Sequence, residues 1–175
     1  RNCLRGNYRI QPTQGGCSVF PPPRISKEKS RGIEMKVDFL MRSLMFVPAH
    51  NDRLMNSASR SSADVLLLDI EDSVQPIENK QVARNNIIKY IQEGLFKDRI
   101  LFPRVNDRES GQLLKDVYQL SIDGITGFMY PKAHKGEDIY FIGKLLETIE
   151  AEKGFPIGKF KIIPLIQTTS AVMNI

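Results

Sequence analysis

The sequence predicts an α/β protein in which helices cover a parallel sheet, and three observations support this. Short apolar runs at residues 43–47, 65–68, 100–105, 125–130 and 162–166 have the length of strands. Segments with apolar residues at helical spacing separate these runs. Runs that are apolar throughout indicate strands buried on both faces, which is typical of parallel sheets covered by helices.

A candidate helix follows each run. Asn51 is a suitable N-cap for a helix over roughly residues 52–60, and a fifth helix is expected to begin near Ser170. The apolar positions of the second to fourth helices are Val82, Ile87, Ile88, Ile91 and Leu95; Leu113, Leu114, Val117, Tyr118 and Leu120; and Ile142, Leu145, Leu146 and Ile149.

Two architectures fit this alternation, a doubly wound sheet and a (β/α)₈ barrel. Both place functional residues at the carboxyl ends of strands, where Asp69, Arg104, Lys132 and Gln167 are found. The turn at residues 48–52 has no glycine, which argues against a dinucleotide site of the Rossmann type. Periodicity alone leaves the choice open.

Residues 1–34 differ in composition from the rest of the chain. They hold seven of the 25 Lys and Arg residues and two of the 20 acids, which leaves 18 of each for residues 35–175. We interpret residues 1–34 as a disordered or non-native leader, with translation starting at Met35; a targeting or nucleic-acid-binding arm is the alternative. The balanced charge of residues 35–175 gives no electrostatic reason to expect a nucleic-acid partner.

The cysteine content and hydropathy favour a cytoplasmic protein. Cys3 and Cys17 both lie in the leader, so no disulfide is expected in residues 35–175. No apolar run approaches the roughly 18 residues that a membrane span needs. The N-terminus also lacks an apolar stretch of signal-peptide type.

Five segments, in this order and spacing, carry a resemblance to a known family. They are residues 42–48 (RSLMFVP), 68–74 (LDIEDSV, followed by Lys80, Ala83 and Arg84), 103–106 (PRVN), 127–132 (GFMYPK) and 163–168 (IPLIQT). Together they resemble the citrate lyase β-subunit and malyl-CoA lyase family of the HpcH/HpaI aldolase superfamily. The resemblance implies that residues 35–175 form the N-terminal half of a (β/α)₈ (TIM) barrel.

Such a barrel needs about 250 residues. We therefore expect a TIM barrel truncated after about five strands. An unclosed half-barrel exposes a strand edge and an apolar face, so the fragment alone is expected to be inactive and prone to associate.

The resemblance also implies a carbon–carbon lyase. The expected reaction cleaves or forms a β-hydroxyacyl-CoA of the malyl-CoA, citramalyl-CoA or citryl type, with a keto acid bound to Mg²⁺. A CoA thioester is then a substrate, and the complete protein is expected to be a homo-oligomer. The alternatives are a keto-acid aldolase that does not use CoA, and a non-catalytic subunit that has lost its metal site.

Arg104, Asp69 and Glu71 are the predicted catalytic residues. The resemblance implies that Arg104 binds the substrate carboxylate, a role that suits a planar guanidinium with paired donors. Asp69 and Glu71 are expected to orient Arg104. The alternative for Arg104 is a structural ion pair with Asp69 or Glu71, and Asp72 fits equally well at a helix N-terminus.

Other binding roles are assigned by position. Lys132 follows the fourth run and is predicted to bind substrate; a solvated loop lysine is the alternative. Phe46 and Arg53 match positions that contact CoA in the family, although core packing is the simpler expectation for Phe46 and solvent exposure for Arg53. Gln167 occupies the position of a metal-binding glutamate, and its neutral amide weakens the case for Mg²⁺.

His50 and His134 lie in predicted loops. Neither has a second histidine at the i, i+4 spacing typical of a metal site. We therefore expect both side chains at the surface.

Overall fold

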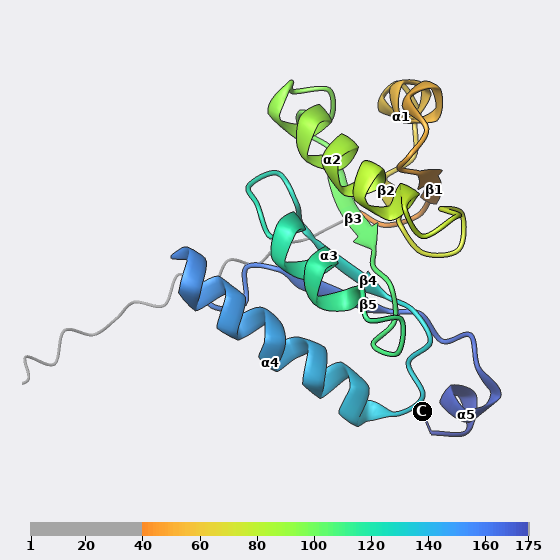
Figure 1. Ribbon diagram of the computed structural model, residues 1–175, viewed down its shortest axis with the longest axis vertical. Helices are drawn as coiled ribbons and strands as arrows, with labels where there is room; N and C mark the ends of the chain where they lie inside the picture. The colour runs from red at the N-terminus through yellow and green to blue at the C-terminus, as the bar shows by residue number, and fades with distance from the viewer. Residues whose placement is uncertain (1–39, 175) are drawn as a thin grey trace, which may run out of the picture. The chain divides into compact units, whose positions relative to one another are not determined.

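The computed structural model describes residues 40–174, in which five strands alternate with five helices (Figure 1). The elements are β1 Leu44–Pro48, α1 Asp52–Ser59, β2 Val65–Asp69, α2 Asn79–Gln92, β3 Ile100–Arg104, α3 Leu113–Leu120, β4 Gly127–Tyr130, α4 Gly136–Lys153, β5 Lys161–Pro164 and α5 Thr169–Met173. Each strand and helix expected from the sequence is present. The predicted leader and the predicted start at Met35 lie outside the described residues.

The five strands form one parallel sheet in the order β1-β2-β3-β4-β5. A doubly wound sheet reverses its direction of growth at a switch point, whereas a barrel adds each strand beside the one before it. The order here has no reversal within residues 40–174. The winding is therefore that of a (β/α)₈ barrel, which confirms the predicted fold class.

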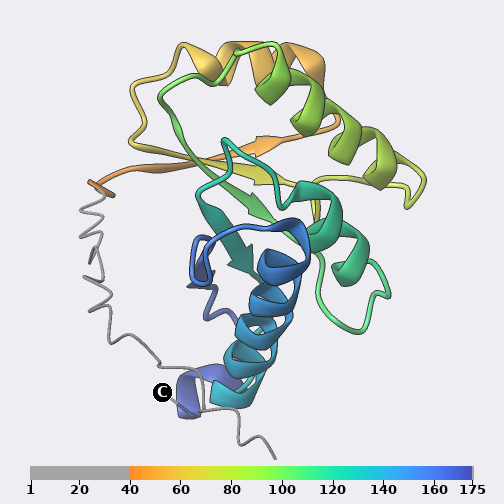
Figure 2. The ribbon, with the colours of Figure 1, turned by 90° about the vertical axis from the view of Figure 1, so that its left-hand side faces the viewer.

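Helices α1 to α4 pack on one face of the curved sheet (Figure 2). Leu66 and Leu68 of β2 belong to the core between the sheet and these helices. Val65 and Leu67 alternate with them and contribute to a second core on the opposite face. Every residue of β2 is buried, as its continuous apolar run predicted.

Local capping explains where helices α1, α4 and α5 begin or end. The Asn51 side chain accepts a hydrogen bond from the Leu54 backbone N–H at 3.1 Å, which confirms the predicted N-cap of α1. Thr168 caps α5 in the same way, through the Ala171 N–H at 3.1 Å. Helix α4 ends at Gly154, whose φ of 75° is in the left-handed region that favours glycine.

The apolar positions predicted for α2 and α3 are partly wrong. Val82, Leu114 and Tyr118 are exposed. The buried face of α2 instead carries Lys80, Ala83, Arg84 and Ile87, at the i, i+3, i+4 and i+7 spacing. The charged side chains of Lys80 and Arg84 thus occupy core positions, where they form hydrogen bonds with buried polar groups.

None of the helices in residues 40–174 combines the length and hydropathy of a membrane span.

Candidate active site

The carboxyl ends of β2, β3 and β4 bring the predicted catalytic residues together. Asp69 is the last residue of β2 and Arg104 the last of β3, and the two are register partners in the sheet. Lys132 follows β4 by two residues. We call the cluster of Asp69, Glu71, Arg104 and Lys132 the mouth cluster.

Asp69 holds the Arg104 guanidinium by two short hydrogen bonds. Nε donates to Oδ1 at 2.7 Å and Nη2 donates to Oδ2 at 2.6 Å. The Asp69 side chain is buried, while that of Arg104 is 12% exposed. This bidentate contact fixes the plane of the guanidinium and still leaves part of it accessible.

The other edge of the Arg104 guanidinium makes only long contacts. Nη1 lies 3.3 Å from Glu71 Oε2 and 3.4 Å from Asp72 Oδ2. The ring of Phe46, 47% exposed, stacks on the guanidinium with 4.7 Å between its centroid and Cζ. Arg104 is thus oriented on two sides, and its Nη1 atom makes only the two long contacts with acids.

Lys132 joins the cluster from β4. Its Nζ lies 2.7 Å from Glu71 Oε1 and 3.2 Å from Asp107 Oδ2. The residue has a φ of 50°, a left-handed conformation that costs a non-glycine residue roughly 1 kcal/mol or more. Such strain persists where surrounding contacts determine the conformation, and the two ion pairs of Lys132 are such contacts.

The pKa values of the two acids of the mouth cluster are shifted in opposite directions. Burial opposes ionisation of Asp69, but the hydrogen bonds from Arg104, Ser73 and Glu71 outweigh it and lower the pKa of Asp69. Burial raises the pKa of Glu71, against the opposing effect of Lys132. Asp69 is therefore the firmly ionised partner of Arg104, and Glu71 is the more readily protonated acid.

A buried network lies directly behind this cluster. The Lys80 ammonium donates to the backbone carbonyls of Ile70 and Glu71 at 3.0 Å each, and to Asn106 Oδ1 at 2.6 Å. Lys80 is buried, which lowers its pKa. These bonds fix the loop that follows β2, and with it the position of Glu71.

The network continues to Arg84 through Asp116, a fully buried acid. Asp116 Oδ2 accepts from the backbone and side-chain N–H of Asn106 at 2.8 and 2.7 Å. Arg84 Nε donates to Asp116 Oδ1 at 2.6 Å. We call Lys80, Arg84, Asn106 and Asp116 the core network. The role of this network was not predicted from the sequence, where Lys80 and Arg84 appear only as part of the second segment of the family resemblance.

The structure places the other predicted site residues as follows. Core packing was the simpler expectation for Phe46, and it is wrong. The Phe46 ring lies half-exposed over Arg104. Arg53 is exposed in the first turn of α1. Gln167 is exposed in the loop between β5 and α5.

The two histidines differ in exposure. His134 is exposed as expected, whereas His50 is only partly exposed. The His50 Nδ1 atom is buried without a hydrogen-bond partner among residues 40–174. The surface prediction thus holds for His134 and is too simple for His50.

No group of three His, Cys, Asp or Glu side chains in residues 40–174 has the arrangement of a metal site. The acids of the mouth cluster contact Arg104 and Lys132, and Gln167 offers only a neutral amide. The described residues therefore do not by themselves fit a divalent cation.

The sheet has the winding of an α/β barrel and carries a fixed arginine among acids at its carboxyl edge, and sequence comparison specifies the family. The family model described as HpcH/HpaI aldolase/citrate lyase matches residues 42–175. The chain belongs to this family, which confirms the resemblance inferred from the five segments.

Two curated relatives show which members are similar. The L-malyl-CoA/β-methylmalyl-CoA lyase of Rhodobacter capsulatus is 35% identical over 118 residues, which cover 66% of this chain and 37% of the relative. The citrate lyase subunit beta of Leuconostoc mesenteroides subsp. cremoris is 26% identical over 140 residues, or 80% of this chain and 46% of the relative. The chain thus spans less than half the length of either relative.

Solved structures agree on the fold. A malate synthase of Haloferax volcanii, native at 3 mM glyoxylate, superposes with a TM-score of 0.68 at 20% identity, over 77% of this chain and 44% of that one. RipC from Yersinia pestis gives a TM-score of 0.53 at 19% identity, over 78% and 51%. At these identities the likeness concerns the fold alone.

Proposed function

We propose that this chain supplies the carboxylate-binding half of the active site of a carbon–carbon lyase. The reaction is the cleavage or formation of a β-hydroxyacyl-CoA of the malyl-CoA, citramalyl-CoA or citryl type. The observation that carries the proposal is the Arg104 guanidinium, held in one plane by Asp69 and accessible at the strand ends of a barrel of this family. A substrate carboxylate would accept from its Nη1–Nη2 edge.

The acids around Arg104 act as positioning residues in this proposal. Asp69 fixes the guanidinium plane, so the arginine loses little side-chain entropy when the substrate binds. Glu71 contacts both Arg104 and Lys132 and links the two cations. Lys132 adds positive charge beside the substrate and offsets part of the negative charge of the neighbouring acids.

Phe46 and Arg53 are proposed to contact the CoA thioester. Phe46 leaves half its ring exposed beside Arg104, and Arg53 lies in the first turn of the helix that follows the same strand. An exposed apolar ring suits the pantetheine chain, and a guanidinium suits a CoA phosphate. This places the thioester arm on the β1 side of the substrate carboxylate.

The resemblance implies Mg²⁺, and Gln167 holds the position of the expected carboxylate ligand. Because its amide lacks charge, we propose weak Mg²⁺ binding at this position and assign no step of the reaction to the ion. A homo-oligomer and a cytoplasmic location remain predictions of the same resemblance.

The direct test is a cleavage assay of the purified full-length protein with malyl-CoA, citramalyl-CoA and citryl-CoA, in which the released keto acid is trapped as a hydrazone. Keto-acid release that Arg104→Lys reduces would support the proposal. Keto-acid release that Arg104→Lys leaves unchanged would remove Arg104 from the site.

Two further functions are compatible with the family. An aldolase without CoA would cleave the free hydroxy acid as fast as its thioester, so the two substrates are compared side by side. A non-catalytic subunit is favoured by one observation, the neutral Gln167. It would bind the CoA ester without releasing keto acid, which calorimetry separates from a failure to bind.

A further inference from the structure

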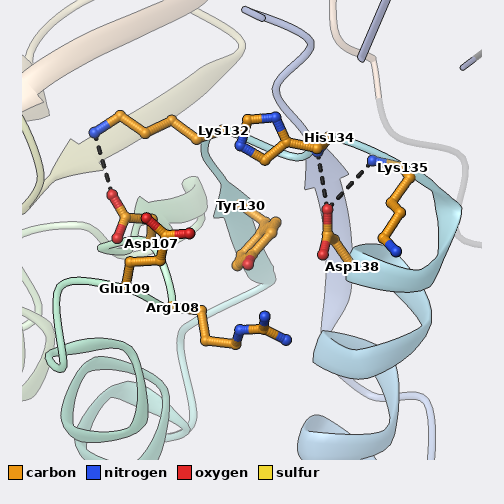
Figure 3. Close-up of a pocket in the computed structure, with 8 residues that line it drawn as sticks. All are labelled: Asp107, Arg108, Glu109, Tyr130, Lys132, His134, Lys135 and Asp138. Atoms are coloured by element: carbon orange, nitrogen blue, oxygen red, sulfur yellow. Dashed lines mark hydrogen bonds and ion pairs between the residues drawn. The ribbon is translucent and has the colours of Figure 1, made fainter. Parts of the chain in front are cut away.

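A polar pocket lies on the helix-covered face of the sheet, apart from the arginine of the mouth cluster. Phe128 and Tyr130 of β4 point toward the helices, and Met129 between them points to the opposite face. Beside Tyr130 is a pocket of about 220 Å³ (Figure 3). Its lining residues are Asp107, Arg108, Glu109, Tyr130, Lys132, His134, Lys135 and Asp138.

The Tyr130 hydroxyl is the unusual group in this pocket. Its side chain is 4% exposed and its hydroxyl makes no hydrogen bond with residues 40–174, but the hydroxyl oxygen is not among the fully buried unpaired atoms. The hydroxyl therefore faces the space of the pocket, where water or a ligand can accept its hydrogen bond. Figure 3 shows the ring between the loop that carries Arg108 and the first turn of α4. A bound group in this pocket would supply the missing partner.

Three acids and three bases line the pocket, and they differ in how they are paired. Asp138 accepts hydrogen bonds from the backbone N–H groups of His134 and Lys135 at 2.9 and 3.2 Å, and Asp107 contacts Lys132 at 3.2 Å. These two acids are therefore already engaged within the protein.

Lys132 is paired, but the other two basic residues, Arg108 and Lys135, are exposed and are not engaged in this way. Arg108 and Lys135 form no ion pair with a carboxylate in residues 40–174. The Arg108 guanidinium lies 5.5 Å from the centroid of the Phe141 ring, a contact that orients it and leaves its in-plane donors free. Glu109 is the remaining acid, and it is exposed.

We propose that this pocket binds a small molecule through an oxyanion, a phosphate or a carboxylate, with the Tyr130 hydroxyl and Arg108 as donors. The pocket is below the 300 Å³ at which sites for drug-sized ligands begin, so a whole CoA does not fit. Burial raises the pKa of Tyr130, which keeps the hydroxyl protonated and able to donate at neutral pH. Lys132 lines this pocket but also pairs with Glu71 in the mouth cluster, and Asp107 pairs with Lys132. Neither residue is therefore suitable for a selective test.

The test is calorimetric titration of the 175-residue chain with inorganic phosphate and, separately, with malonate. Tyr130→Phe should weaken binding of the preferred anion about fivefold, as expected for one hydrogen bond to a charged group. Arg108→Gln should weaken it about tenfold or more. Tyr118→Phe and Arg60→Gln are matched controls with exposed side chains outside the pocket, and should leave binding unchanged.

The Arg104→Gln variant separates this pocket from the mouth cluster. Binding that survives Arg104→Gln and is lost in Arg108→Gln supports the proposal, and the anion that binds more tightly identifies the ligand class. Binding that Arg104→Gln abolishes and Tyr130→Phe leaves intact would overturn it, as would no binding of either anion. The result does not depend on lyase activity.

Discussion

The mouth cluster and the core network are both built from charged side chains, but they differ in access to solvent. In the mouth, the Arg104 side chain is 12% exposed and that of Lys132 is 42% exposed. In the core, Arg84 and Asp116 are 2% and 0% exposed. The core pair can recognise nothing outside the fold, whereas the mouth cluster keeps donors available for a ligand.

The two regions also differ in how fully their charges are matched. The core network satisfies both Asp116 oxygens by hydrogen bonds from Arg84 and Asn106. In the mouth, both Glu71 oxygens make ion pairs without a well-directed hydrogen bond among residues 40–174. Complete pairing indicates a structural role, and incomplete pairing indicates a place where a ligand changes the balance.

The largest expected effect comes from breaking the core network. Asp116→Ala removes the partner of a buried arginine and should lower the free energy of unfolding by about 3–5 kcal/mol. Urea denaturation measures it. The matched control is Asp123→Ala, because Asp123 pairs with Lys159 while 90% exposed, and its loss should cost little. Similar losses for both variants would contradict the assignment of the core network to stability.

Arg104→Lys should have the next largest effect, and on function. A point charge cannot replace bidentate contact, so kcat/KM should fall about 10²-fold or more in the thioester cleavage assay. Arg60→Lys is the control at an exposed helix end. The unfolding free energy of Arg104→Lys should fall by less than that of Asp116→Ala, which distinguishes the two regions.

Gln167→Glu sharpens the comparison by adding charge beside the mouth. Two unit charges 4 Å apart attract each other by about 4 kcal/mol at an effective dielectric of about 20, and the divalent charge of Mg²⁺ doubles this attraction to a carboxylate. In the full-length protein we expect Mg²⁺ binding about tenfold tighter or more, measured by calorimetry with glyoxylate or pyruvate present, and higher lyase activity. Gln92→Glu, at the exposed end of α2, should show no gain. Equal affinities for wild type and Gln167→Glu would mean that position 167 is not a metal ligand.

The smallest expected effects concern pH, and the two mouth acids should differ in sign. Asp69 has a lowered pKa, so its contribution to stability is present above its ordinary pKa and is lost as the pH falls through the folded-state pKa. Glu71 has a raised pKa, so it reduces stability as the pH rises above its ordinary value.

Variants separate these two contributions. Asp69→Asn should destabilise the fold at pH 7, with an effect that shrinks in acid. Glu71→Gln should be slightly stabilising at pH 7, by less than about 1 kcal/mol because Lys132 is partly exposed. Denaturation at pH 7 and in acid checks both, and effects of the same sign at pH 7 would contradict the assignment.

Apolar periodicity predicted an α/β protein with a parallel sheet, and the polar residues at strand ends indicated the edge of the sheet for the candidate site. The barrel itself was predicted from the five segments that resemble the family. The sequence placed Asp69 beside Arg104 correctly, since register partners on parallel strands share an edge. It did not predict the core network, because Lys80 and Arg84 look like solvent-facing residues until Asn106 and Asp116 are known to meet them.

The wrong prediction for Phe46 and the unpredicted pocket beside Tyr130 have a similar cause. Phe46 is an aromatic residue on a strand, which suggests the core, and only three-dimensional packing shows it over Arg104. The pocket beside Tyr130 combines a loop after β3 with the start of α4, which lie far apart in the sequence. Apolar periodicity predicts single helices and strands, so it cannot predict contacts between loops.

The central claim is that Arg104 contacts the carboxylate of an acyl-CoA substrate, and one measurement addresses it directly. Succinyl-CoA and butyryl-CoA have acyl chains of equal length and differ in the terminal carboxylate. The ratio of their dissociation constants is measured for wild type and Arg104→Lys. We predict that wild type prefers succinyl-CoA and that the variant loses about tenfold or more of this preference. An unchanged ratio would contradict the claim and leave Arg104 with a purely structural role.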